Sequence, residues 1–319
     1  MAVFAGIDEA GYGPILGPLV VSSSIFSIPD DLVGADLWHV LRRSVVDKRK
    51  QRAGRLLICD SKKAYSKTVG IGHLERTVLA FLRCLHEQPA TLGELLTMVC
   101  PDLTERLAGY PWYTQAGHCR IMADQADIEL ASRVLKNDLT SQSIQFLGVH
   151  SCCLDVAHYN RMVTAVKNKA NVLFSATAQL IKRACDNLSA DELQVVVDRQ
   201  GGRVRYRREL QRMFPDMELR ILCESASTSS YELKEGGRKM RLHFVVGADE
   251  RFLPVSLASM VSKYLRELLV ANINRYFRGF HAGLRPTAGY WKDGLRFIED
   301  LKRNLPHVQF DSNQLIRCR

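Results

Sequence analysis

Four carboxylates stand where apolar stretches of the chain end. Asp8 and Glu9 follow VFAGI, Asp198 ends LQVVV, and Asp249 comes directly after LHFVVGA. Short apolar runs rich in β-branched residues predict buried strands, and strand ends in an open α/β sheet commonly meet at one edge. We therefore expect three distant chain segments to bring these four acids into one cleft.

Carboxylates that converge in this way raise one another's pKa unless a cation neutralises them. Oxygen donors without a matching His or Cys spacing suit Mg²⁺ or Mn²⁺ rather than zinc. Two such ions about 4 Å apart could activate a water and stabilise the leaving oxygen of a phosphoryl displacement. The alternative interpretation is that the three aspartates cap turns or helices, as Asp often does.

The neighbouring acids Asp8 and Glu9 raise a geometric problem, because successive side chains of a regular strand point to opposite faces. Both can face one cleft if the strand ends between them. Gly11 and Gly13 follow closely and make such a break easy.

Composition is that of an ordinary globular protein with a net positive charge. The chain has 319 residues, 46% of them apolar and 24% charged, and Lys and Arg outnumber Asp and Glu by 44 to 34. The resulting net charge of +10 favours a polyanionic partner. Nine cysteines without a C-x-x-C pair indicate a reducing compartment. With no signal-like leader and no apolar run of spanning length, we expect a cytoplasmic protein that does not enter a membrane.

Strands alternate with helices along most of the chain, which predicts an α/β domain covering residues 1–319. The expected strands are 2–8, 18–28, 192–198, the segment MELRILCE, and a hairpin that turns at Glu235-Gly236-Gly237. The expected helices are 158–187, 203–213, 254–277 and 292–303, the last two within a helical C-terminal region, 254–319.

The segment 87–145 is predicted to be an insertion, because three prolines break it and GYPWYTQ concentrates aromatic residues in a loop. Two roles are open for it. It could extend a nucleic-acid groove through Trp112, Tyr113 and Arg120, or it could cover an edge of the sheet.

Several common catalytic signatures do not fit. The glycines of GYGP precede proline and an apolar strand, whereas a dinucleotide-binding loop must open a helix. The sequence also has neither a G-x-x-x-x-G-K-[ST] phosphate loop nor a G-x-S-x-G nucleophile elbow.

Four motifs, in the same order along the chain, resemble those of type 2 ribonucleases H, the ribonuclease HII family. They are GIDEAGYGPILGPLVV at 6–21, DSKK at 60–63, VVVD at 195–198 and ADERFLPVSLASMVSKYLRE at 248–267. The resemblance implies a ribonuclease H-like fold, with a central mixed sheet flanked by helices, and endonucleolytic hydrolysis of RNA paired with DNA. It makes Asp8, Glu9, Asp198 and Asp249 the catalytic residues and the ligands of two Mg²⁺ or Mn²⁺ ions, with Asp8 bridging both ions and Asp249 nearer the attacking water.

The same resemblance implies a set of substrate-binding residues, namely Gly11, Tyr12, Gly13, Ser61, Lys62, Lys63, Lys263 and Tyr290. Tyr12 stands where the family has Arg, which removes a cationic phosphate contact and leaves cleavage at a single embedded ribonucleotide an open question. Tyr290, in GYWKDG, is the candidate for a family tyrosine that stacks at the RNA–DNA junction. A packing role is the alternative for each tyrosine.

We therefore expect a monomeric, metal-dependent ribonuclease H that acts on an RNA/DNA hybrid or on DNA containing ribonucleotides. A catalytically silent hybrid-binding protein is the main alternative, and a related nuclease acting on DNA junctions is a third possibility.

Overall fold

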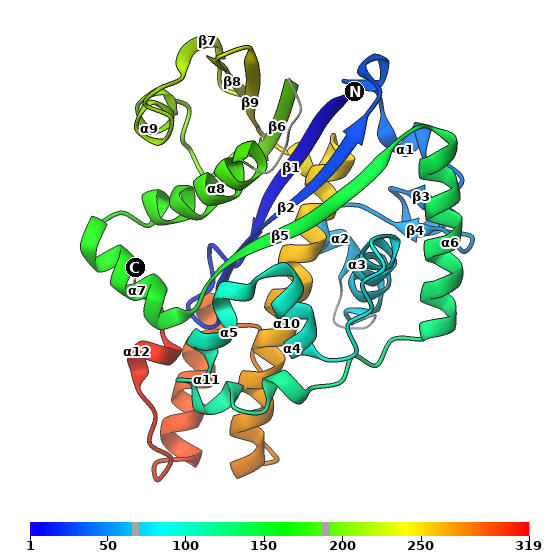
Figure 1. Cartoon of the computed structure of the whole chain (residues 1–319). Coiled ribbons are helices and arrows are strands. Elements are labelled where there is room, and N and C mark those ends of the chain that lie inside the picture. Colours follow the sequence, from blue (N-terminus) through cyan, green and yellow to red (C-terminus); the bar gives the residue numbers. More distant parts are fainter. Residues whose placement is uncertain (66–69, 187–191, 319) are drawn as a thin grey trace.

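A seven-stranded mixed sheet forms the centre of the protein in the computed structural model, which describes residues 1–65, 70–186 and 192–318 (Figure 1). The strand order is β5-β2-β1-β6-β9-β8-β7, in which β1, β6 and β9 are parallel and the other pairs antiparallel. The strands are β1 (Ala2–Ala10), β2 (Leu19–Ile28), β5 (Gln145–Leu154), β6 (Glu192–Asp198), β7 (Glu218–Glu224), β8 (Thr228–Glu235) and β9 (Arg238–Val245).

A second, two-stranded parallel sheet and the helices lie around this centre. The small sheet consists of β3 (Val45–Val46) and β4 (Leu56–Leu57). The α-helices are α1 (Leu37–Val40), α2 (Ser61–Ala64), α3 (Gly72–Cys84), α4 (Leu92–Val99), α5 (Pro101–Leu107), α6 (Gln125–Ser141), α7 (Val156–Val166), α8 (Lys169–Asp186), α9 (Arg207–Met213), α10 (Leu253–Phe280), α11 (Trp291–Asn304) and α12 (Ser312–Leu315). The 3-10 helices are η1 (Asp30–Leu32), η2 (Arg49–Gln51), η3 (Pro111–Tyr113), η4 (Ala116–His118) and η5 (Ala248–Glu250).

The two faces of β1 belong to two different hydrophobic cores. Val3, Ala5 and Ile7 pack with residues of α7 and α8, whereas Phe4 belongs to the core that contains α10. This alternation is the period of two that a pleated strand imposes. The expected central mixed sheet flanked by helices is therefore confirmed, and the face of each residue on β1 is fixed.

Helix α10 lies directly against β1, and the close approach depends on Gly6. A β-carbon at Gly6 would lie 2.2 Å from the backbone of both Pro254 and Val255, so no larger side chain fits. Figure 1 shows the long helix α10 passing behind β1 and β2.

Three details of the sequence-based expectations are wrong. The expected helix 158–187 is two helices, α7 and α8, separated at Lys167, whose φ of 52° is left-handed and ends α7. The expected helix 203–213 begins at Arg207. Strand β1 continues to Ala10, so the strand does not end between Asp8 and Glu9.

The segment 87–145 folds into α4, α5 and α6 with two 3-10 turns, and it closes against the α10 side of the sheet (Figure 1). Trp112 and Tyr113 are buried, and the Trp112 ring lies 6.0 Å from that of Phe277. These two aromatic side chains are therefore core residues and cannot stack on nucleic acid. That the segment is an insertion, and that 1–319 form one domain with a separate helical region from 254, stay predictions.

Each of the nine cysteines is a free thiol. Among the described residues, no helix combines the length and apolar composition that crossing a bilayer would require.

The contact between β1 and α10 gives a first prediction. Gly6→Ala should lower the free energy of unfolding by about 3 kcal/mol or more, because its methyl group meets the backbone of α10. Gly279→Ala, near the end of the same helix, has no heavy atom within 4 Å of the added carbon and should be neutral or mildly stabilising. Urea denaturation of both variants measures the difference, and equal stabilities would contradict the packing.

Candidate active site

The parallel pairing of β1 with β6 sets two of the predicted carboxylates side by side. The register ends with Ile7 opposite Val197, and one residue further along each strand stand Asp8 and Asp198. Neighbouring strands lie about 4.8 Å apart, so these side chains share the end of the sheet without any long-range adjustment.

Asp8 is buried on the α10 face of β1, where serines of that helix hold it. The Ser262 hydroxyl donates to the Asp8 carbonyl oxygen at 3.0 Å, and Ser259 forms a hydrogen bond with the Asp8 carboxylate. The Ser259 hydroxyl also forms a 3.0 Å hydrogen bond with the hydroxyl of Ser61, which connects α10 to α2 beside the acid.

Asp249 reaches the same place from the short turn between β9 and α10. Gly247 adopts a left-handed φ of 64° and starts η5, which carries Asp249. The next amide, that of Ala248, donates to Asp198 Oδ1 at 2.8 Å. Asp198 is thereby hydrogen-bonded to the residue that directly precedes Asp249.

The pKa shifts of Asp8, Glu9 and Asp249 arise in part from repulsion by neighbouring acids. Burial, then Glu9 and Asp198, raise the pKa of Asp8 well above its usual range. Burial and Asp198 raise the pKa of Glu9 to about 7, and burial and Asp198 raise that of Asp249 to about 6. Burial likewise raises the pKa of Asp198. The four carboxylates are therefore near enough to repel one another, and their role as one catalytic set stays a prediction.

The donor set suits a hard divalent cation, because it offers carboxylate oxygens alone and carries more negative charge than the surroundings neutralise. Over residues 1–65, 70–186 and 192–318, however, no three Asp, Glu, His or Cys side chains are grouped closely enough to hold a metal ion. The residues fit the ion chemically, and binding would have to draw them together.

A pocket of about 190 Å³ opens beside the carboxylates and collects most of the residues that the resemblance implies for substrate binding. Glu9 joins it to the acid cluster. Seven of the eight expected residues line it: Gly11, Tyr12, Gly13, Ser61, Lys62, Lys263 and Tyr290.

The three expected lysines differ in their surroundings. Lys62 is exposed, and its charge lowers the pKa of both Glu9 and Asp198. Lys63 lies outside the pocket and forms a 2.6 Å ion pair with Glu250. Lys263 is 7% exposed, and its ammonium group lies 2.7 Å from Glu267. Of the three, Lys62 is the cation placed to meet a ligand in the pocket.

The two expected tyrosines also lie at the pocket. Tyr290 is 48% exposed, which excludes the alternative of a buried packing residue. The carbonyl of the preceding Gly289 accepts from the amides of Ile15 and Leu16, so its loop is fixed to the glycine turn. Tyr12 is half-buried, and Lys169 lies 5.2 Å from the centre of its ring.

Three residues of the site are absent from the sequence-based prediction. Asp60 adds a further carboxylate, since its charge raises the pKa of Asp198 and of Asp249. Ser259 supports Asp8. Arg266 is buried beneath the glycine turn, where it donates to the carbonyls of Leu16 and Ala288. The DSKK motif contains Asp60, and helical spacing after Asp249 could have indicated Ser259; a local signal for Arg266 is lacking.

Comparison with known proteins gives matches among solved structures alone, since no family model and no curated protein matches the sequence. Ribonuclease HII of Archaeoglobus fulgidus, solved as a complex with PCNA, is 18% identical, with 99% of this chain and 94% of that chain covered and a TM-score of 0.45. Ribonuclease H2 of Pyrococcus horikoshii is 13% identical, with 98% and 92% covered and a TM-score of 0.48. A Bst ribonuclease HIII solved with Mn²⁺ is 13% identical, with 99% and 66% covered and a TM-score of 0.46.

These neighbours are type 2 ribonucleases H, the family that the sequence motifs resemble. At this degree of likeness the function of the chain has to be inferred from its own site.

The acid cluster gives a prediction that needs no activity measurement. Asp249 has its pKa raised to about 6, so it stabilises the protonated protein and this contribution is lost as pH rises from about 4 through 6. In EDTA, Asp249→Asn should be more stable than the native protein at pH 8, by on the order of 1 kcal/mol after allowance for its partial exposure, and not at pH 4.

Thermal melting of the two proteins at both pH values measures this difference. Asp216→Asn, an exposed acid elsewhere on the surface, is the control and should change neither value. A loss of stability in Asp249→Asn at pH 8 would show that the carboxylate is not under repulsion.

Proposed function

We propose that this protein is a divalent-metal-dependent endoribonuclease that hydrolyses the RNA strand of RNA/DNA hybrids. The observation that carries the proposal is the proximity of Asp8, Glu9, Asp198 and Asp249 at the end of the parallel strands, where Asp198 raises the pKa of each of the other three. Buried acids at this density are unfavourable for stability, and a bound cation relieves them.

The four carboxylates would hold Mg²⁺ or Mn²⁺. When bound, such ions lower the pKa of an attacking water and neutralise the developing charge on the phosphodiester. Asp8, buried and hydrogen-bonded by Ser259, provides the least mobile oxygen of the set. Asp249, on a turn with greater exposure, would be the acid nearer the attacking water.

The adjoining pocket would position the nucleic acid. Lys62 supplies a positive charge between the carboxylates and the pocket, where it can contact a phosphate. Gly11 and Gly13 permit close approach of a sugar to the backbone, and Tyr290 offers an exposed ring for stacking. Tyr12 brings no positive charge to this turn, so discrimination for ribose would depend on backbone contacts and ring packing.

Loss of one carboxylate tests the proposal directly. Asp8→Asn should lower hybrid cleavage by at least about a thousandfold while the protein stays folded, because amide oxygens hold the cation poorly and carry no charge. Labelled hybrid, single-ribonucleotide and all-DNA duplexes, each assayed in Mg²⁺ and Mn²⁺, measure the effect against Asp216→Asn, which should retain full activity.

The assay also separates the competing functions. Binding of hybrid without turnover in either metal would favour a silent binding protein. Preferential cutting of all-DNA junctions would favour a related DNA nuclease. Cleavage that persists in EDTA would contradict the metal-dependent mechanism.

Tyr290 provides a second test, directed at substrate binding. Tyr290→Ala should raise the KM for hybrid about tenfold, since stacking on an aromatic ring contributes about 1–3 kcal/mol per base. Tyr290→Phe keeps the ring and should behave as the native protein. If both variants bind and cleave normally, Tyr290 does not contact the substrate.

A further inference from the structure

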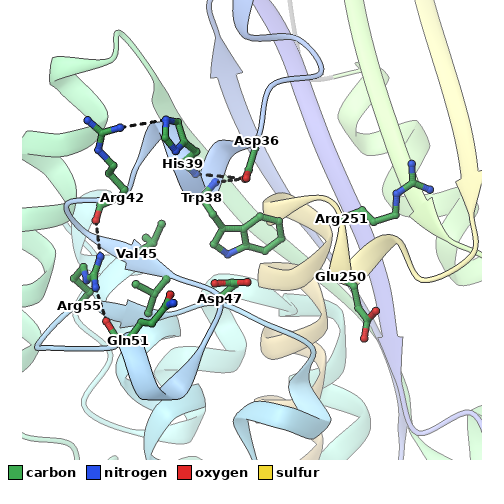
Figure 2. Close-up of a pocket in the computed structure, with 11 residues that line it drawn as sticks. Asp36, Trp38, His39, Arg42, Val45, Asp47, Gln51, Arg55, Glu250 and Arg251 are labelled. Carbon is green, nitrogen blue, oxygen red and sulfur yellow. Dashed lines mark hydrogen bonds between the residues drawn. The ribbon is translucent and has the colours of Figure 1, made fainter.

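A larger pocket, of about 350 Å³, is lined in part by Glu250 and Arg251, which follow Asp249, and none of the proposed chemistry uses it. Figure 2 shows side chains of α1, β3 and the following loop on one side, and Glu250 and Arg251 on the other. Trp38 lies among them. We call this site the Trp38 pocket, defined by Trp38, Arg42, Asp47, Arg55, Glu250 and Arg251.

Positive charge prevails in the Trp38 pocket once existing pairs are taken into account. Glu250 is already paired with Lys63 at 2.6 Å, which leaves two acids of the lining, Asp36 and Asp47, without an ion pair among the described residues. Against these two stand three arginines, and none of the three has an ion pair among the described residues.

The arginines keep their charge available in different ways. Arg42 contacts His39 at 3.1 Å, and Arg55 donates to backbone carbonyls, including that of Arg42 at 2.9 Å. The Arg251 guanidinium lies over the Phe252 ring at 5.5 Å. A neutral partner orients a guanidinium without cancelling its charge, so a polyanion would find three oriented cations here.

Trp38 forms a fixed wall of the pocket. Its indole Nε1 donates to the Ile58 carbonyl at 2.8 Å, and the Asp36 carboxylate caps α1 by accepting from the Trp38 amide at 3.0 Å. An aromatic side chain held in this way can contact a base or sugar at little entropic cost.

Two contacts join this pocket to the candidate active site. The turn η5 carries Asp249 into the carboxylate cluster and Glu250 into the Trp38 pocket. Arg49, in the loop that follows β3, donates to the carbonyls of Lys63 and Ala64 in α2, each at 3.0 Å. The Trp38 pocket and the carboxylates therefore adjoin the same turn, η5.

We propose that the Trp38 pocket binds the phosphodiester backbone of the nucleic acid a short distance from the bond that is cut, with Arg42 and Arg251 contacting phosphates and Trp38 contacting a base or sugar. This inference rests on the proposed function for the identity of the ligand. It assigns a role to the run of Arg and Lys residues between positions 42 and 55, which the carboxylate chemistry leaves unexplained.

The test measures binding in the Asp8→Asn background, so that no cleavage occurs, by titrating a labelled RNA/DNA hybrid at a series of salt concentrations. Loss of two phosphate contacts in Arg42→Gln/Arg251→Gln should weaken binding about tenfold near 0.1 M salt. It should also reduce the slope of log affinity against log salt by about two. Trp38→Phe should bind like the parent, and Trp38→Ala more weakly.

Arg43→Gln/Arg205→Gln is the matched control. Arg43 is the immediate neighbour of Arg42 but lines a different pocket, and Arg205 is 88% exposed beside α9. This control removes the same net charge, so a general loss of positive potential would affect both pairs equally. Equal affinity for hybrid and equal salt slope in the two double variants would overturn the proposal. It would also be overturned if Arg42→Gln/Arg251→Gln lost binding of inorganic phosphate but bound hybrid as tightly as the parent.

The outcome is independent of the cleavage assay. If the native protein binds hybrid without cutting it and Arg42→Gln/Arg251→Gln weakens that binding, the pocket assignment stands and the catalytic proposal fails. If the native protein cuts hybrid and the double variant binds like the control, the pocket assignment fails alone. Thermal melting of every variant verifies that it is folded.

Discussion

Repulsion between carboxylates that are both buried and adjacent is the constraint on which the architecture around the site depends. Asp8 and Asp198 are forced together because β1 and β6 are parallel and in register to the last pair. Such an arrangement lowers stability, so the surrounding structure has to hold it. Ser259 and Ser262 of α10 form hydrogen bonds with Asp8, and the amide of Ala248 donates to the carboxylate of Asp198. Burial against α10 prevents the strand end from moving outward.

Helix α10 combines two requirements that would otherwise conflict. Its first turns pack on Gly6 so closely that the helix cannot shift along β1, and two turns further on Ser259 and Ser262 face Asp8. The next turn places Arg266 under the glycine turn and joins that turn to the loop that carries Tyr290. One rigid element therefore determines both where the acids lie and where the adjoining pocket opens.

Local pattern was sufficient to predict the elements that carry the acids, because an apolar run followed by Asp fixes both a buried strand and its polar end. The local pattern did not predict the length of the first strand. Strand β1 continues through Glu9, although successive side chains of a strand point to opposite faces and Glu9 follows Asp8 directly. Trp112 and Tyr113 were open to a stacking role because their aromatic segment reads as a loop in sequence, yet α10 covers them, and Lys63 meets an acid 187 positions away. Periodicity records that a residue is buried or exposed within its own element, and it carries no information on which distant surface covers it.

The distribution of cations around the site follows from the same electrostatics. A lysine or arginine free to approach the carboxylates would form ion pairs with them and compete with a metal ion. Lys63 is occupied by Glu250, while Lys263 and Arg266 both face Glu267, at 2.7 and 3.5 Å. The nearby positive groups are thus held by other acids, apart from Lys62, and the four carboxylates keep the negative charge that a divalent cation requires. In the Trp38 pocket the relation is reversed, since the acid Glu250 is neutralised and the arginines are not. The four carboxylates and the arginines of the Trp38 pocket are thus both left without ion pairs. This arrangement suits a single polyanionic strand that meets metal ions at the carboxylates and guanidinium groups at the Trp38 pocket.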